Sequence, residues 1–212
     1  HETTIPVTLD DICYHGRAVA AGLQNAMLML DMPFGSLNSP QQAIDNASVL
    51  LKHTQAQVVK LEGGKTQLKT VETLAEFGIA SCSHLGLQPQ MVHKMGGYRV
   101  QGKAKSAAEE MLNTARELEA AGTDLLLLEC VPAPLAAEIT ALLEIPVIGI
   151  GAGADVDGQI LVLQDVLNVT PGKKPKFSKN FMQGQSSIQA AISRYVNEVK
   201  RGQFPDKTHS FS

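Results

Sequence analysis

The chain alternates between short apolar runs and longer segments in which apolar residues recur every three or four positions. Short apolar runs bounded by glycine, proline or polar residues predict buried strands, and the periodic segments predict helices that bury one face. We expect strands at residues 25–31, 57–62, 79–84, 124–129 and 146–151, and a sixth strand around residues 160–169. Because helices separate strands that are apolar on both faces, the pattern indicates a parallel sheet covered by helices.

Capping residues mark where several of the expected helices begin. Thr8 can cap the first helix, and the Ser-Pro pair at residues 39–40 matches an N-cap followed by proline at the first helical position. Ser106 and Glu109 have the spacing of a capping box for a later helix. The last helix is expected to bury one face, made of Ile188, Ile192, Tyr195 and Val199.

Two architectures fit this alternation, a (β/α)8 barrel and an open doubly wound sheet. The six expected strands are two fewer than a closed barrel needs, whereas an open sheet accepts six. The chain has 212 residues, of which 44% are hydrophobic and 18% charged, and this is enough for one domain with a substantial core. No linker divides it, so we expect a single domain over residues 1–212.

Composition excludes several classes of function. The net charge is −3 and the basic residues are scattered, which argues against nucleic-acid binding. No apolar run approaches the roughly 20 residues of a membrane span. Cys13, Cys82 and Cys130 are isolated and odd in number, which favours reduced thiols in a cytosolic protein over disulfides or a zinc site.

Charged side chains stand at the ends of four successive expected strands. One strand ends at Asp31, the next carries Lys60 and Glu62, and the following two end at His84 and Glu129. Lys60 and Glu62 share a face because residues two apart in a strand point the same way. In a barrel the C-terminal strand ends meet at one mouth, where polar side chains serve chemistry.

Each of these residues also has a purely structural interpretation. Asp31 could cap a turn, Lys60 and Glu62 could form a structural ion pair, and a lone histidine is more often a satisfied core residue than a ligand or base. Glu129 is harder to dismiss, because it follows four leucines and an unpaired buried carboxylate is costly. Taken together, the pattern favours one shared site.

The composition of this site suggests enolate chemistry. Two carboxylates from neighbouring strands offer the hard oxygen ligands that suit Mg²⁺. Such an ion can chelate a 2-oxo acid and stabilise the enolate that forms when a proton leaves the adjacent carbon. Lys60 would add positive charge against that anion, and Glu129 could accept the proton.

Several strings along the chain closely resemble the ketopantoate hydroxymethyltransferase family: LMLDMPFGS, VVKLEGG, CSHLGLQPQ, GGYRVQGK, LLLLECVPAPLA and IPVIGIGAGADVDGQILVLQDVL. The resemblance implies a (β/α)8 barrel of the phosphoenolpyruvate/pyruvate superfamily. It implies transfer of a hydroxymethyl group from 5,10-methylenetetrahydrofolate to 3-methyl-2-oxobutanoate, giving 2-dehydropantoate in pantothenate synthesis. A cytosolic homo-oligomer, often a decamer, is typical of the family.

The resemblance also implies a role for each strand-end residue. Asp31 would bind Mg²⁺ and the oxo acid, and Glu62 would contact the Mg²⁺ shell. Lys60 and His84 would bind substrate, and Glu129 would act as the catalytic base. Family members carry two earlier strands and a Gly-Asp-Ser motif that this sequence lacks, and the chain begins with histidine. We therefore expect a barrel that is incomplete at its N-terminal side.

Other functions stay open at the level of the sequence. The first alternative is another Mg²⁺-dependent 2-oxo acid C–C lyase of the same superfamily, and the second is a catalytically silent truncated remnant. A nucleotide-binding open sheet is the third, because a glycine-rich turn occupies residues 149–153. Its G-x-G-x-G spacing differs from the dinucleotide fingerprint, so a barrel loop is preferred.

Overall fold

The computed structural model describes residues 3–212, and its centre is one sheet of six parallel strands. The strands are β1 (Met29–Asp31), β2 (Val58–Glu62), β3 (Ser81–Gly86), β4 (Leu125–Glu129), β5 (Val147–Ile150) and β6 (Gly158–Gln159). They lie side by side in chain order, β1-β2-β3-β4-β5-β6. A doubly wound sheet reverses its strand order at a switch point, whereas a barrel keeps chain order. The order therefore supports the expected barrel architecture.

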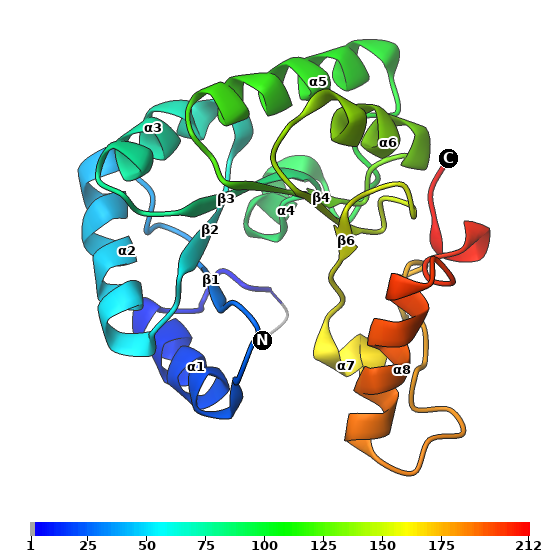
Figure 1. The fold of residues 1–212 in the computed structure, drawn as a ribbon. Helices are drawn as coiled ribbons and strands as arrows, with labels where there is room; N and C mark the ends of the chain where they lie inside the picture. The colour runs from blue at the N-terminus through cyan, green and yellow to red at the C-terminus, as the bar shows by residue number, and fades with distance from the viewer. Residues whose placement is uncertain (1–2) are drawn as a thin grey trace.

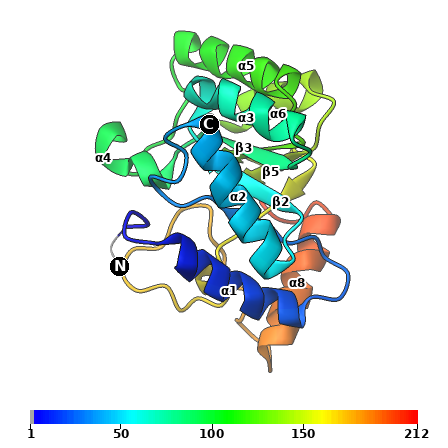
Figure 2. The ribbon, with the colours of Figure 1, turned by 90° about the vertical axis from the view of Figure 1, so that its left-hand side faces the viewer.

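Helices follow the strands around the outside of the curled sheet, and Figure 2 shows α1, α2, α3 and α5 in succession on this side. The α-helices are α1 (Leu9–Gly22), α2 (Pro40–Thr54), α3 (Leu68–Glu76), α4 (Val92–Met95), α5 (Lys105–Ala120), α6 (Ala133–Leu142), α7 (Leu163–Val166) and α8 (Ile188–Lys200). Short 3₁₀ turns are η1 (Gly64–Gln67), η2 (Pro89–Met91) and η3 (Lys207–His209). None of the helices in residues 3–212 is long and apolar enough to cross a membrane.

The two faces of the sheet bury different sets of side chains, because successive residues of a strand point to opposite faces. Outward-facing residues such as Val59, Leu61 and Leu126 pack against the helices in the main hydrophobic core. A smaller cluster fills the concave face, and its buried members are Val58, Cys82, Leu127 and Ile150. The concave cluster is the floor on which the strand-end residues stand.

The barrel is open on one side. Within residues 3–212, β1 pairs only with β2, and β6 pairs only with β5. Figure 1 shows the opening between β1 and β6, with α1 on one side and α7 and α8 on the other. Two apolar residues next to these edges are exposed, Met27 before β1 and Ile160 after β6.

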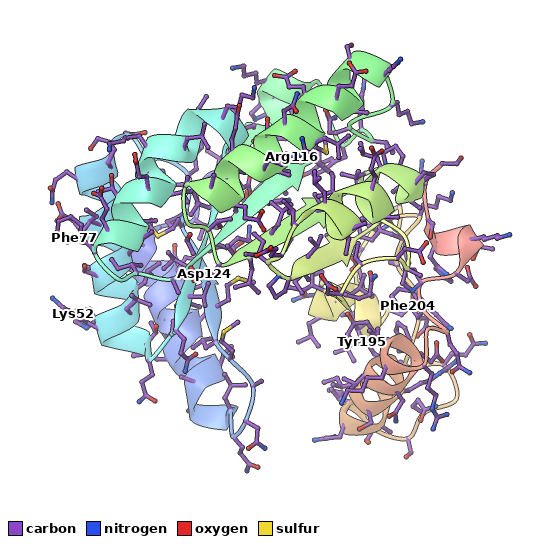
Figure 3. All side chains as sticks on the ribbon, turned by 45° about the horizontal axis from the view of Figure 1, so that its top comes forward. Lys52, Phe77, Arg116, Asp124, Tyr195 and Phe204 are labelled. Atoms are coloured by element: carbon purple, nitrogen blue, oxygen red, sulfur yellow. The ribbon has the colours of Figure 1, made fainter. Side chains whose placement is uncertain are left out.

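A satellite core holds α7, α8 and the C-terminal segment together. The rings of Phe181 and Phe204 lie 5.1 Å apart, and Tyr195 of α8 stacks edge-on against Phe181 at 5.2 Å. Figure 3 shows Tyr195 and Phe204 side by side in this region. The buried face of α8 expected from the sequence is wrong at two positions, because Ile188 is 50% and Ile192 39% exposed. Tyr195 and Val199 pack against the satellite core, whereas Ile188 and Ile192 are not among the side chains that do.

The capping signals were predictive at two helices and wrong at a third. The Thr8 hydroxyl accepts a hydrogen bond from the Asp11 N–H and completes a capping box at α1. Ser39 likewise accepts from the N–H of Gln42 at α2. Helix α5 instead begins at Lys105 with no side-chain cap, so Ser106 lies inside its first turn. The predicted capping box at residues 106–109 therefore does not form.

The sixth strand is displaced from its predicted place. Strand β6 covers only Gly158–Gln159, and the apolar stretch near residues 160–169 contains the short helix α7 instead. Val162 and Leu163 are each 51% exposed. An apolar run of this length does not by itself distinguish strand from helix, so the periodicity misled here. The other five strands lie within the predicted regions, although β1 is shorter and β3 ends two residues later.

Candidate active site

Strand register brings the charged strand ends to one edge of the concave face. Asp31 is paired in register with Lys60, and Glu62 with His84. On β4, Leu127 lies opposite His84, so Glu129 projects from the same face two residues further on. All five residues predicted from the strand ends therefore lie at the C-terminal mouth of the barrel, above the concave cluster.

Lys60 is the cation at the centre of the site. Its Nζ lies 3.0 Å from Asp31 Oδ2 and 3.9 Å from Glu62 Oε1. Only 8% of Lys60 is exposed. Burial by itself would lower the pKa of Lys60, but the carboxylates of Asp31 and Glu62 more than offset it and raise the pKa above its ordinary value. The amine therefore stays charged under physiological conditions.

His84 connects the lysine to the glutamate of β4. Its Nδ1 lies 3.5 Å from Lys60 Nζ, and its Nε2 lies 3.3 Å from Glu129 Oε2. An ammonium group can only donate, so Nδ1 accepts and the ring proton of the neutral tautomer sits on Nε2. Although Glu129 is near, Nε2 has no partner with hydrogen-bond geometry among residues 3–212. A buried donor in this state is available for an oxygen of a bound molecule.

Solvent exposure of the site residues increases from the buried bottom of the site to its accessible rim. The side chains of Lys60, Glu62 and His84 are 9%, 5% and 2% exposed, whereas those of Glu129 and Asp31 are 15% and 51% exposed. A substrate entering from solvent would meet Asp31 and Glu129 first. The buried residues beneath them can orient and polarise it in a medium of low dielectric constant.

Two glutamines after β3 belong to the site, although the strand-end pattern did not single them out. The Gln90 N–H donates to Glu62 Oε2 at 3.0 Å, and its side-chain amide donates to the carbonyl oxygen of Met32 at 2.8 Å. The Gln88 amide donates to the His84 carbonyl oxygen at 3.1 Å. Polar residues directly after a strand end were the available signal, at residues 88–90.

The thiols take no part in this arrangement. Burial raises the pKa of Cys82 and that of Cys130 to about 12. Thiols are nucleophiles and metal ligands only as thiolates, so these two are inert at neutral pH. All three cysteines are free and buried.

The carboxylate oxygens at the mouth suit a hard cation that keeps most of its bound water molecules. No group of three or more His, Cys, Asp or Glu side chains in residues 3–212 is arranged to hold a metal ion. Asp31 and Glu62 nevertheless supply two carboxylates at one mouth, and Asp31 is half exposed. Mg²⁺ commonly takes only one or two carboxylates from a protein and completes its octahedron with water and substrate. The residues present are therefore compatible with Mg²⁺.

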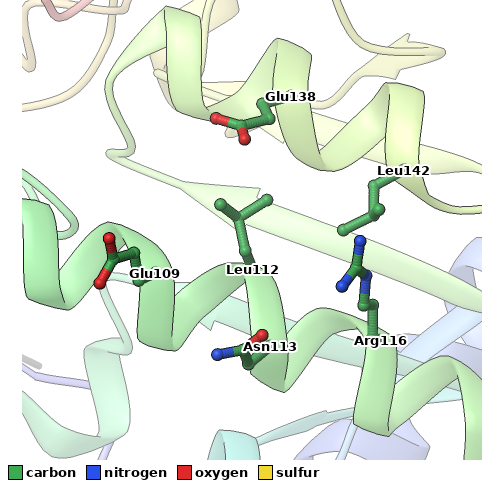
Figure 4. Close-up of a pocket in the computed structure, with 6 residues that line it drawn as sticks. All are labelled: Glu109, Leu112, Asn113, Arg116, Glu138 and Leu142. Atoms are coloured by element: carbon green, nitrogen blue, oxygen red, sulfur yellow. The ribbon is translucent and has the colours of Figure 1, made fainter.

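A groove on the surface lies away from the mouth of the barrel. It has a volume of about 340 Å³ and runs between α5 and α6 on the outside of the barrel. Figure 4 shows its lining residues: Glu109, Leu112, Asn113, Arg116, Glu138 and Leu142. None of these is a strand-end residue. The convergence of acid, base and cation at the mouth is the better indicator of chemistry.

A parallel α/β sheet in barrel order, with carboxylates, a lysine and a histidine at its C-terminal mouth, defines the class as a (β/α)-barrel enzyme. The sequence profile of the family Ketopantoate hydroxymethyltransferase matches residues 1–207. Proteins called 3-methyl-2-oxobutanoate hydroxymethyltransferase are similar over the whole chain. That of Alkalilimnicola ehrlichii is 57% identical over 99% of this chain and 76% of its own length, and that of Marinobacter nauticus is 53% identical over 100% and 80%. This chain belongs to the ketopantoate hydroxymethyltransferase family.

Solved structures agree on the fold. Orotidine 5'-monophosphate decarboxylase from Methanocaldococcus jannaschii superposes with a TM-score of 0.54 at 14% identity, covering 88% of this chain and 79% of that one. The 2,3-dimethylmalate lyase, a member of the PEP mutase/isocitrate lyase superfamily, gives 0.53 at 12% identity, covering 92% and 77%. At such identities the likeness concerns architecture alone. The lyase alternative therefore gains no support, while the transferase relatives are matched at 50% identity or more.

Proposed function

We propose that this protein transfers a hydroxymethyl group from 5,10-methylenetetrahydrofolate to 3-methyl-2-oxobutanoate and so forms 2-dehydropantoate. The observation that carries the proposal is the convergence of five ionisable residues at the barrel mouth, in a chain matched over its whole length by enzymes of that name. The substrate is small and anionic, and the buried Lys60 is a matching cation.

Glu129 is the proposed catalytic base. It accepts the proton from C3 of the oxo acid, and the electron pair of that C–H bond passes into the enolate. The new C–C bond forms between C3 and the methylene carbon of the folate, and both C–N bonds of that carbon break. Water supplies the hydroxyl oxygen, and the proton from C3 and one proton from water end on the two nitrogens of the departing tetrahydrofolate. Glu129 suits this role because its side chain is 15% exposed and no lysine or arginine pairs with it within residues 3–212.

Lys60 and His84 are the proposed substrate-binding residues. A charged Lys60 stabilises the negative charge that develops on the enolate oxygen, and the low dielectric of a buried site strengthens this effect. The Nε2 proton of His84 supplies a hydrogen bond to a substrate oxygen, which explains why this buried donor has no protein partner among residues 3–212.

Asp31 and Glu62 are the residues that would hold Mg²⁺. When bound, the ion supplies positive charge that polarises the keto group of the substrate. The two carboxylates also pair with Lys60, so their negative charge has two functions. Asp31 contributes to the binding of the oxo acid as well, because it reaches the rim.

We further propose that two additional parallel strands pair with the free edges of β1 and β6 and close the barrel. Two observations support this: within residues 3–212 no other strand pairs with these edges, and Met27 and Ile160 beside them are exposed. Assembly into a homo-oligomer in the cytosol, a decamer as in the family, belongs to the same proposal. Light scattering on the complete natural gene product tests the assembly, since a monomer would contradict it.

The decisive experiment separates proton removal from group transfer. The complete natural gene product is incubated with 3-methyl-2-oxobutanoate in D₂O, and loss of the C3 proton is followed by NMR with and without Mg²⁺. Hydroxymethyl transfer is then measured after addition of the folate. We expect both activities, and both should fall on chelation of the metal. Exchange without transfer would support the lyase alternative, and the absence of both would support a silent remnant.

Replacement of Glu129 by glutamine tests the base. Glu129→Gln keeps the size of the side chain and removes its basicity, so we expect C3 exchange to fall by about 10²–10⁴-fold. Glu138→Gln on the outside of α6 is the matched control and should keep wild-type exchange. Exchange in Glu129→Gln within a few-fold of wild type would assign the base to another residue.

A further inference from the structure

Gln90 connects the ends of three neighbouring strands at the mouth. It lies in η2, the turn that follows β3. Its N–H donates to Glu62 Oε2 at the end of β2, and its side-chain Nε2 donates to the carbonyl oxygen of Met32, the residue after β1. Met32 in turn donates its N–H to the Lys60 carbonyl oxygen at 2.8 Å. One residue thus ties together the segments that carry Asp31, Lys60 and Glu62.

These bonds divide the two oxygens of the Glu62 carboxylate between different partners. Oε2 accepts from Gln90, while Oε1 lies 3.9 Å from Lys60 Nζ and 3.7 Å from His84 Nδ1. The Glu62 side chain is only 5% exposed, so it has few other ways to satisfy Oε2. Fixing Oε2 orients Oε1 toward the centre of the site.

The same residue limits the movement of the Asp31 segment. Asp31 is half exposed, and β1 has only three residues and one neighbouring strand in residues 3–212. A short edge strand is easily displaced, and the Gln90 amide anchors it to η2 through a neutral hydrogen bond. The separation of the Asp31 and Glu62 carboxylates therefore depends on Gln90.

We propose that Gln90 is a positioning residue, which sets the relative geometry of the Asp31 and Glu62 carboxylates and thereby the affinity of the mouth for a divalent cation. This inference rests on the proposed function, in which these two carboxylates hold Mg²⁺. Partners that orient metal-binding carboxylates commonly contribute 10- to 100-fold to metal affinity.

The test measures Mg²⁺ binding directly, by calorimetry on the complete, metal-free natural gene product. Gln90→Met keeps the length of the side chain and the backbone N–H bond to Glu62 but removes the amide bond to Met32, so it tests how Gln90 anchors the Asp31 segment. We expect the Kd for Mg²⁺ to rise by about 10-fold, the lower end of the usual range for such supporting contacts. The control is Gln41→Met on α2, where an exposed amide donates to Asp45. The midpoint of thermal unfolding is recorded for both variants, to separate positioning from loss of fold.

A second variant gives a readout that a merely structural role would not change. Gln90→Glu presents a carboxylate to the Met32 carbonyl oxygen at neutral pH but an O–H donor once it is protonated. Gln90→Glu should bind Mg²⁺ more weakly than wild type at neutral pH. We expect the difference in affinity between the two proteins, measured at the same pH, to become smaller as the pH falls toward about 5. This comparison decides the question even if Gln90→Met does not fold.

The outcomes distinguish this inference from the proposed function. If wild type binds no Mg²⁺ and exchanges no C3 proton, the proposed function fails and the positioning role fails with it. If wild type does both, but Gln90→Met binds Mg²⁺ as well as Gln41→Met does, only the positioning role is overturned. A pH-independent deficit in Gln90→Glu would likewise overturn it.

Discussion

Pairing explains how single charged residues are tolerated at the mouth. An unpaired charge taken out of water is strongly unfavourable, and removing one partner of a buried pair typically costs about 3–5 kcal/mol. Burial of Lys60 is tolerated because Asp31 from the adjacent strand β1 and Glu62 from its own strand β2 pair with it. The geometry therefore supports the interpretation of Lys60 and Glu62 as a structural ion pair, and the catalytic role of these residues stays a prediction.

The raised pKa of Lys60 makes a prediction about stability at alkaline pH. The folded chain holds this proton more tightly than the unfolded chain does, so the contribution is complete below the ordinary value of 10.5. It is lost as the pH rises through the higher pKa of the folded state. We expect Lys60→Met to lower the free energy of unfolding by about 3–5 kcal/mol at pH 7. The gap to wild type should shrink above pH 10.5.

Urea unfolding of wild type and Lys60→Met over a series of pH values measures this gap. Lys52→Met, on the exposed surface of α2, is the control and should follow wild type throughout. A gap of constant size from neutral to strongly alkaline pH would show that packing, rather than charge pairing, makes the contribution.

At the scale of single elements, a capping motif predicts where a helix begins only if the backbone of the capping residue is extended rather than helical. Thr8 has an extended backbone, and its hydroxyl reaches the Asp11 N–H. Ser106 lies two residues after the N-cap position, which Ala104 occupies, because α5 begins at Lys105. The spacing of the capping box was present in the sequence at residues 106–109, but the backbone at residue 106 is already helical.

Substitution of these two residues tests that difference. Thr8→Ala removes an N-cap and should lower the free energy of unfolding by about 1 kcal/mol. Ser106→Ala removes a hydroxyl inside a helical turn and should change it by no more than about 0.5 kcal/mol. Urea titrations of the two variants and of wild type under identical conditions measure both free-energy changes. Equal losses in the two variants would mean that the hydroxyl of Ser106 caps α5 in solution.

Strands were easier to locate than their exact ends. Apolar runs identified five of the six strands, because burial on both faces of a parallel sheet requires them. Residues 160–169 carry a similar run, yet they form an exposed connection and the helix α7. The pairing of β6 with β5 ends at Gln159, and the sequence of the following residues does not predict this end.

The concave cluster supports the mouth of the whole molecule. Leu127 is 3% exposed and lies directly across from His84 in the sheet. Leu127→Ala should leave a cavity beneath the site and lower the free energy of unfolding by about 2–5 kcal/mol. Because interiors are closely packed, we also expect the catalytic rate to fall as His84 loses its support.

Leu163→Ala is the matched control, since it removes the same atoms from a residue that is 51% exposed. We expect it to cost less than about 1 kcal/mol. Chemical denaturation of the two variants side by side makes the comparison. A small loss for Leu127→Ala would contradict the role of the concave cluster, and a large loss for Leu163→Ala would show that further chain covers this residue.

The sequence by itself determined the alternation of strands and helices, the type of sheet and the residues at the strand ends, because burial and period are local properties. It also contained enough family resemblance to indicate the reaction. Only the tertiary structure decided that the strands follow barrel order, because pairing joins segments far apart in the chain. The contacts of Gln90 with Glu62 and Met32 arose in the same way, since they span 28 and 58 positions and only folding brings those residues together.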